Sequence, residues 1–186
     1  MREFKNEQIT FYCNCAGELH IGGKQDLKSV EELPLPLQKV YETLWTDFLT
    51  APCYIAYVDD KPGLLFMALY DDEECALQSI PTERDAKIAA LREKCERLEK
   101  LTKQISPEAE IGIGEDTGFD TELVMFIPTE TVQPLDALRL LFLMNEYALS
   151  DPPDKVEWDN SQLIAFAQRY LPESDVRTEM IVQLEK

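Results

Sequence analysis

Hydrophobic and polar positions divide most of the chain into three successive units, each a β-hairpin followed by a helix. Residues 8–22, 53–70 and 110–127 contain short β-type runs separated by turn residues. Helical spacing of apolar residues follows each of them, over residues 36–49, 83–105 and 134–149. The pattern therefore predicts an α+β fold in which antiparallel hairpins build one sheet and about four helices pack on it, as successive ββα units.

Two of these predicted helices have distinct apolar faces. The first, over residues 36–49, carries one broad stripe, whereas the helix over 83–105 carries only a narrow seam that Thr102 interrupts. Thr82 and Asp85 resemble a capping box at its start. We expect this helix to lie on a sheet or to pair with another helix, and a homodimer through residues 83–105 would be one form of such pairing.

The run over residues 64–70 is apolar at every position, which predicts a central strand covered on both faces. Residues 59–63 before it are expected to form a loop, with Pro62-Gly63 as the turn signal. The apolar stripes and central strands together predict a core, which comprises Leu44, Phe48, Phe66, Leu91, Leu98, Phe126 and Leu138.

The C-terminal part begins where the segment Ser-Asp-Pro-Pro-Asp, residues 150–154, breaks the chain. Asp159 or Asn160 is expected to cap a helix whose apolar residues share one face. Residues 178–185 fit a strand or a helix, and we favour a strand. We expect one domain over residues 1–186, with residues 151–186 as a candidate C-terminal helical appendage.

Composition places the chain among ordinary globular proteins, with 45% hydrophobic and 29% charged residues. No apolar run approaches the ~20 residues of a membrane span, and Met1 is followed by polar residues, unlike a signal peptide. Five cysteines, an odd number, indicate reduced thiols. These features predict a cytoplasmic protein.

The charge balance is the feature that departs from the ordinary. There are 36 acidic and 18 basic residues, for a net charge of −18. The basic residues concentrate in the predicted helix over 83–105, so the remainder of the chain is strongly acidic. Such a chain is repelled by nucleic acid and by anionic membranes and is attracted to basic surfaces; the alternative interpretation is that the charge serves solubility alone.

Candidate metal chemistry is limited to Cys13, Cys15 and His20. A type I turn over residues 14–17 with a bulge would place Cys13 with Ile9 and Phe11 on one face, and His20 on the other. We therefore expect a buried Cys13, an exposed His20 and no metal site. The spacing of an EF-hand loop is also missing from the acidic segment 115–122.

Candidate catalytic chemistry is equally sparse. A single Asp116-Thr117-Gly118 tripeptide lacks the flanking residues and the second copy of an aspartic protease. The pairs at residues 59–60 and 71–72 would lie on the order of 20 Å apart, at opposite ends of one strand. No phosphate-binding glycine motif is present. We predict no catalytic residues and no cofactor.

The sequence thus predicts a small acidic interaction protein that binds a basic partner surface, as an inhibitor, an immunity protein or a nucleic-acid mimic would. The predicted partner-binding residues lie in two acidic loops, namely Asp71, Asp72, Glu73, Glu74, Glu115, Asp116 and Asp120. One alternative is a binding chaperone for secreted cargo, since the chain is similar in size, charge and helix–hairpin alternation to type III secretion chaperones. Another is an enzyme that uses carboxylates with raised pKa values in a pocket.

Overall fold

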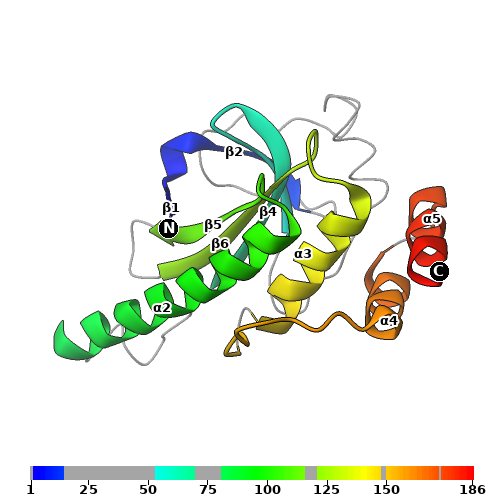
Figure 1. The fold of residues 1–186 in the computed structure, drawn as a ribbon. Helices are drawn as coiled ribbons and strands as arrows, with labels where there is room; N and C mark the ends of the chain where they lie inside the picture. The colour runs from blue at the N-terminus through cyan, green and yellow to red at the C-terminus, as the bar shows by residue number, and fades with distance from the viewer. Residues whose placement is uncertain (1, 15–52, 70–80, 116–120, 148–149, 172) are drawn as a thin grey trace.

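The computed structural model describes residues 2–14, 53–69, 81–115, 121–147, 150–171 and 173–186 (Figure 1). The helices in these ranges are α2 (Pro81–Ile105), α3 (Pro134–Tyr147), α4 (Asn160–Tyr170) and α5 (Asp175–Leu184), and a 3-10 helix η1 (Asn6–Gln8) lies near the N-terminus. The strands are β1 (Arg2–Phe4), β2 (Ile9–Asn14), β3 (Cys53–Val58), β4 (Lys61–Leu69), β5 (Glu110–Glu115) and β6 (Thr121–Pro128). The predicted α+β class is confirmed.

All six strands belong to one sheet with the order β1-β5-β6-β4-β3-β2. The pairings are antiparallel except that of β1 with β5, which is parallel. The element order contains the runs β3-β4-α2 and β5-β6-α3. The rest of the first predicted unit lies outside the described residues, so a succession of three ββα units stays a prediction.

The sheet must curl because its two edge strands are neighbours in the chain. Only Lys5 to Gln8 separate β1 from β2. A flat six-stranded sheet would hold its edges about 24 Å apart, whereas this link reaches at most about 17 Å. The amide of Asp59, in the β3–β4 turn, donates to the carbonyl of Gln8 at 3.1 Å and so ties the link to the sheet.

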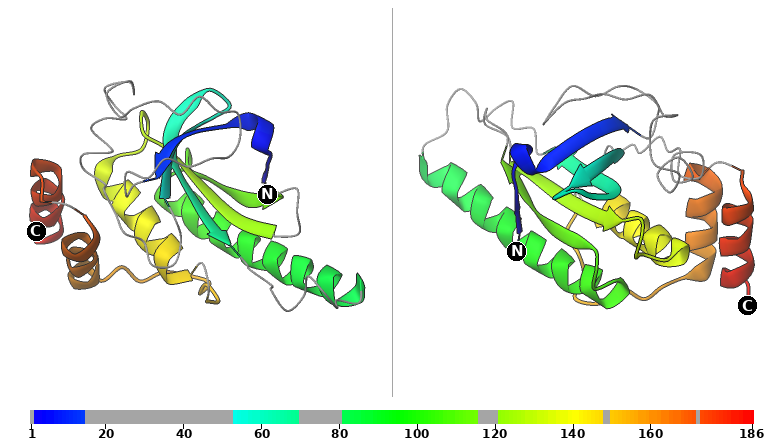
Figure 2. Two further views of the ribbon diagram at one scale, coloured as in Figure 1. Left: turned by 180° about the vertical axis from the view of Figure 1, so that it is seen from behind. Right: turned by 90° about the horizontal axis from the view of Figure 1, so that it is seen from above.

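Helices α2 and α3 cover one face of the curled sheet (Figure 2). Their buried side chains share one cluster with inward residues of β3 to β6, including Phe66 and Met125. The apolar seam of α2 therefore packs against the sheet of the same chain, since Leu91, Cys95 and Leu98 belong to this cluster. Of the predicted core residues, Phe66, Leu91, Leu98, Phe126 and Leu138 are buried as expected, while Leu44 and Phe48 lie outside the described residues.

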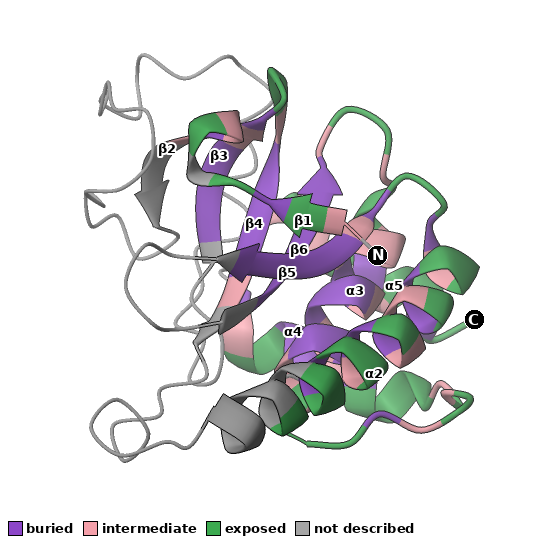
Figure 3. Ribbon diagram, turned by 90° about the vertical axis from the view of Figure 1, so that its left-hand side faces the viewer, coloured by how far each residue is buried: buried purple, intermediate pink, exposed green. Residues whose placement is uncertain are grey.

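The opposite face of the sheet holds a second cluster, in which residues from both edge strands meet residues from the centre. Figure 3, coloured by burial, shows that the central strands of the sheet are largely buried. Phe4 of β1 and Ile9 of β2 lie there with Phe126 of β6. Two glycines make room in this curl. A Cβ on Gly63 would lie 2.4 Å from the Phe126 ring, and one on Gly112 would lie 2.0 Å from the Arg2 carbonyl oxygen.

The C-terminal helices pack on α3 and on each other, away from the sheet (Figure 1). Asp159 caps α4 as predicted, and its side chain accepts from the amide of Ser161 at 2.8 Å. The strand favoured for residues 178–185 is wrong, because α5 runs through this segment. Ser174 caps it by accepting from the amide of Arg177, and Met180 and Leu184, four residues apart, are its buried positions.

Three local predictions also need correction. The β3–β4 turn is the two-residue Asp59-Asp60, both with positive φ, and Pro62-Gly63 lies within β4. Helix α2 begins at Pro81, so Thr82 lies inside it and not at its cap. The pairing of β2 with β3 shifts between Phe11 and Cys13, so a regular alternation does not connect these two positions.

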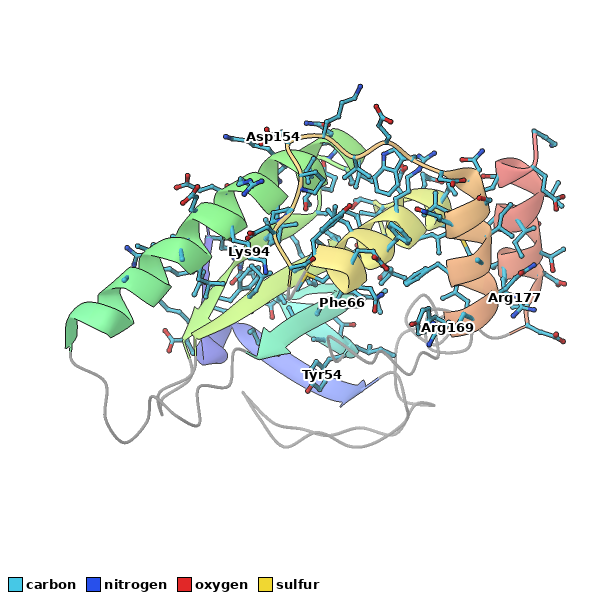
Figure 4. The ribbon with its side chains drawn as sticks, turned by 90° about the horizontal axis from the view of Figure 1, so that it is seen from below. Tyr54, Phe66, Lys94, Asp154, Arg169 and Arg177 are labelled. Carbon is cyan, nitrogen blue, oxygen red and sulfur yellow. The ribbon has the colours of Figure 1, made fainter. Side chains whose placement is uncertain are left out.

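The connector between α3 and α4 lies against α2 (Figure 4). A guanidinium nitrogen of Arg97 donates to the carbonyl of Pro152, and the same nitrogen is 4.0 Å from a carboxylate oxygen of Asp154. Burial lowers the pKa of Lys94, and the nearby charge of Asp151 opposes this shift. The basic side of α2 therefore holds an acidic connector on the surface of the fold.

Candidate functional site

A surface pocket of about 520 Å³ lies at one end of the sheet. Strand topology builds it: Arg2 in β1, Lys61 at the start of β4, Ile111 in β5 and Pro128 at the end of β6 all line it. The parallel pairing of β1 with β5 brings Arg2 to this end. The last turns of α2, the turn before β5 and the turn after β6 contribute the rest of the lining. The pocket therefore combines residues from distant parts of the sequence.

The pocket mixes charges of both signs. Its lining contains three cations, Arg2, Lys61 and Lys103. The carboxylates that line it come from four glutamates, which are Glu99, Glu108, Glu110 and Glu130. Which of these charges can reach a ligand depends on how each one is already bonded within the protein.

Arg2 is held by two carboxylates of the protein. One guanidinium nitrogen donates to Glu110 of β5, and the other donates to Asp59 in the β3–β4 turn. The guanidinium also lies 4.6 Å from the centre of the Phe4 ring. Asp59 and Glu110 belong to different parts of the curled sheet, so Arg2 links the β3–β4 turn to β5 by its side-chain contacts.

Lys103 is likewise engaged by the backbone. Its ammonium donates to the carbonyl of Pro107 at 2.7 Å and to that of Ala109 at 2.8 Å. These carbonyls belong to the turn between α2 and β5, so Lys103 stabilises the C-terminal end of the helix and the entry into the strand. Most of its donor capacity is therefore committed.

The uncharged walls of the pocket are apolar and stiff. Pro62, Pro107 and Pro128 line it together with Ile111. Proline fixes its own backbone φ angle, which limits movement of these walls. The amide of Thr129 donates to the carbonyl of Pro62 at 3.2 Å and so joins the end of β6 to the start of β4.

The acidic loops predicted as the contact surface cannot be compared with this pocket. Asp71 to Glu74, Asp116 and Asp120 lie outside the described residues, as does the side chain of Glu115. The predicted positions of Cys13 and His20 lie outside the described side chains too. These assignments stay predictions.

The thiol of Cys95 is the most strongly perturbed titratable group in the described part of the chain. Burial in the core raises its pKa to about 12, with the charge of Glu99 as a smaller cause. A thiol with so high a pKa is protonated at neutral pH and is a poor nucleophile. Cys95 therefore serves as a core residue on the buried face of α2.

Nothing in the sequence pattern around the pocket residues predicts that they lie together. They are separated by as many as 129 positions, from Arg2 to Thr131, and none belongs to a recognisable motif. The three prolines near strand ends are the one local feature, and prolines at such positions are common. Only the strand order places these residues at one end of the sheet.

Comparisons with protein families, curated proteins and solved structures find no match to this chain. Among the described side chains, no group of three or more histidine, cysteine, aspartate or glutamate residues is arranged to hold a metal ion. None of the helices in the described ranges combines the length and apolar character of a membrane span.

Proposed function

We propose that the chain is a non-catalytic interaction protein that binds a basic surface of another protein, in the manner of an inhibitor, an immunity protein or a nucleic-acid mimic. The observation that supports this is the excess of exposed carboxylates over exposed cations at the surface. Among the described side chains, exposed carboxylates outnumber exposed cations about twofold. An excess of this sign steers association with basic partners and opposes association with nucleic acid.

The half-buried cations reinforce this excess because they are committed to contacts inside the protein. Besides Arg2 and Arg97, Arg139 donates to Asp136 at 3.1 Å, and Arg177 donates to the carbonyl of Leu171 at 2.8 Å. By contrast, the carboxylates at the surface of α5, such as Glu179, are exposed. These half-buried cations thus serve the fold, while most carboxylates of the described part of the chain are exposed.

The chaperone alternative lacks comparable support in the described part of the chain. Cargo binding by a chaperone of that kind needs an exposed apolar patch. Val182 on α5 is the one large hydrophobic residue that is exposed among the described side chains, at 44%. A lone exposed valine is ordinary for a protein surface.

The proposal is tested with two variants that change the net charge equally at different places. One reverses the predicted contact loop, as Asp72→Lys, Glu73→Lys and Glu74→Lys. The other reverses exposed acids of the C-terminal helical region, as Glu173→Lys, Glu179→Lys and Glu185→Lys. Proteins retained by the immobilised wild type are identified, and the purified partner is then used to measure association rates at two ionic strengths.

We expect a basic partner whose association slows with added salt and slows further with the loop reversal. Equal slowing by both variants would mean that the overall charge acts and that the loop is not the contact. A partner that is acidic, or association that does not respond to salt, would contradict the proposal.

A further inference from the structure

We propose that the pocket at the end of the sheet receives a lysine or arginine side chain of the basic partner. This inference rests on the proposed function and gives it a place on the molecule. It follows from three properties of the pocket: the state of its cations, the state of its carboxylates, and the nature of its walls.

The cations of the pocket are poorly placed to bind an anion. Arg2 already donates to Glu110 and Asp59, and Lys103 already donates to two backbone carbonyls. Lys61 is the remaining cation of the lining, and it is exposed. An anionic ligand would have to compete with these internal contacts, or bind to Lys61 alone.

The carboxylates of the rim are in the opposite state. Glu108 and Glu130 line the pocket and are exposed, and no ion pair joins either of them to another described residue. They come from different segments, the turn before β5 and the turn after β6. A cation that contacts either carboxylate would gain a charge-assisted contact without breaking an ion pair within the described part of the chain.

The walls suit the stem of a long basic side chain. Lysine and arginine bury their methylene groups against apolar surface while the charged head stays at a polar rim. Pro62, Pro107, Pro128 and Ile111 provide that surface beside the glutamates. The volume of about 520 Å³ falls within the range of pockets that hold small ligands, roughly 300–1,000 Å³.

The test uses a fluorescent dodecapeptide in which lysine and alanine alternate, and a matched peptide with glutamate in place of lysine. Affinity at low salt is measured for the wild type and for Glu108→Gln, Glu130→Gln and Lys61→Gln. Glu179→Gln, which removes an exposed carboxylate of α5 outside the pocket, is the control with the same charge change. Backbone amide shifts of Ile111 and Thr131 report whether the peptide reaches the pocket.

We expect Glu108→Gln and Glu130→Gln each to raise the dissociation constant roughly two- to fivefold, as for partly exposed ion pairs. Lys61→Gln should lower it, since a repulsive charge is removed, and Glu179→Gln should leave it nearly unchanged. The amides of Ile111 and Thr131 should shift with the lysine peptide and not with the glutamate peptide.

Two other outcomes would overturn the inference in different ways. If Glu179→Gln weakens binding as much as Glu108→Gln and Glu130→Gln do, peptide affinity depends on the net charge of the protein and not on the pocket. The assignment of the pocket then fails, while a basic partner remains supported. If the lysine peptide does not bind at low salt, or if the glutamate peptide binds better, the proposed function fails together with the pocket.

Discussion

Thr102 shows how one residue can conceal a pattern in the sequence. Because threonine carries a hydroxyl group, it breaks the run of apolar residues in the seam of α2. Its side chain is nevertheless fully buried, and Leu91, Cys95 and Leu98 of that seam are buried too. Its hydroxyl oxygen is buried without a hydrogen-bond partner. A buried polar group in this state lowers stability, because it has given up its contacts with water and gained none in the protein.

Replacing Thr102 with valine should therefore raise the free energy of unfolding, by about 1 kcal/mol. Valine has nearly the same shape, so the change removes the hydroxyl and keeps the packing. Urea unfolding of Thr102→Val measures this, with Thr102→Ser as the matched variant that keeps the hydroxyl and should be less stable than the wild type. A less stable valine variant would show that the hydroxyl is bonded.

Cys95 provides a prediction about pH. Burial raises the pKa of its thiol from 9.0 to about 12, so the unfolded chain loses this proton first as the pH rises. The stability contributed by the neutral thiol is complete below pH 9 and declines between pH 9 and 12. We expect the wild type to lose about 1 kcal/mol more than Cys95→Val between pH 7 and pH 10.

Unfolding by urea at the two pH values measures this difference. Lysines and tyrosines also titrate in the alkaline range, but they are common to both proteins and so cancel when the two are compared. Equal losses for the wild type and for Cys95→Val would indicate that the folded thiol ionises near its ordinary pKa.

At the scale of elements, the sequence predicted long, periodic segments well and short, ambiguous ones poorly. The apolar run within β4 predicted a strand and the spacing of the α2 seam predicted a helix, and both elements are present. The β-branched Ile181 and Val182 favoured a strand, whereas the Ser174 cap and the four-residue spacing of Met180 and Leu184 decide for α5. At the β3–β4 turn, two aspartates with positive φ replace the expected Pro-Gly signal.

The central position of β4 predicts a high cost for truncating its core residue. Phe66 is 1% exposed, and β4 lies between β6 and β3. Phe66→Ala should lower the free energy of unfolding by roughly 3–5 kcal/mol, measured by urea unfolding, because it leaves a cavity beneath the helices. Val182→Ala on the exposed side of α5 is the control, and we expect it to change stability by less than about 0.5 kcal/mol. Similar losses in the two variants would contradict the packing of β4.

The connector between α3 and α4 depends on a hydrogen bond more than on an ion pair. Arg97 donates to the carbonyl of the buried Pro152, whereas Asp154 is fully exposed. Arg97→Ala should therefore cost about 1–2 kcal/mol of stability, and Asp154→Ala less than about 0.5 kcal/mol. Thermal unfolding at low and high salt checks both values. A strong dependence on salt, or a large effect of Asp154→Ala, would assign the contact to charge.

For the whole molecule, the curl of the sheet explains why the candidate site could not be predicted. A flat sheet would leave β1 and β2 on opposite edges, with Arg2 far from the β3–β4 turn. The short link between these strands forces the edges together, and Arg2 then reaches both Asp59 and Glu110. Hydrophobic patterns indicate where the strands are but not the order in which they pair. The residues that meet in the pocket could therefore not be predicted from the sequence.

The same core continues from the sheet into the C-terminal helices. Leu163 and Phe166 of α4 and Leu184 of α5 are buried in one cluster with Phe66 of the sheet. An appendage that could separate from the domain would instead need a core of its own. We therefore expect residues 151–186 to unfold together with the rest of the chain, in one cooperative transition.

Trp158 is a suitable local probe of this prediction, because its ring packs 6.2 Å from that of Phe142, between the connector and α3. In a Trp45→Phe variant, which leaves Trp158 as the sole tryptophan, urea unfolding is followed by fluorescence and by far-ultraviolet circular dichroism. Coincident midpoints and slopes are expected, since exposing the α3–α4 contact also opens the cluster that contains the sheet. A fluorescence transition at lower urea would show that the C-terminal helices detach first and form a separate unit.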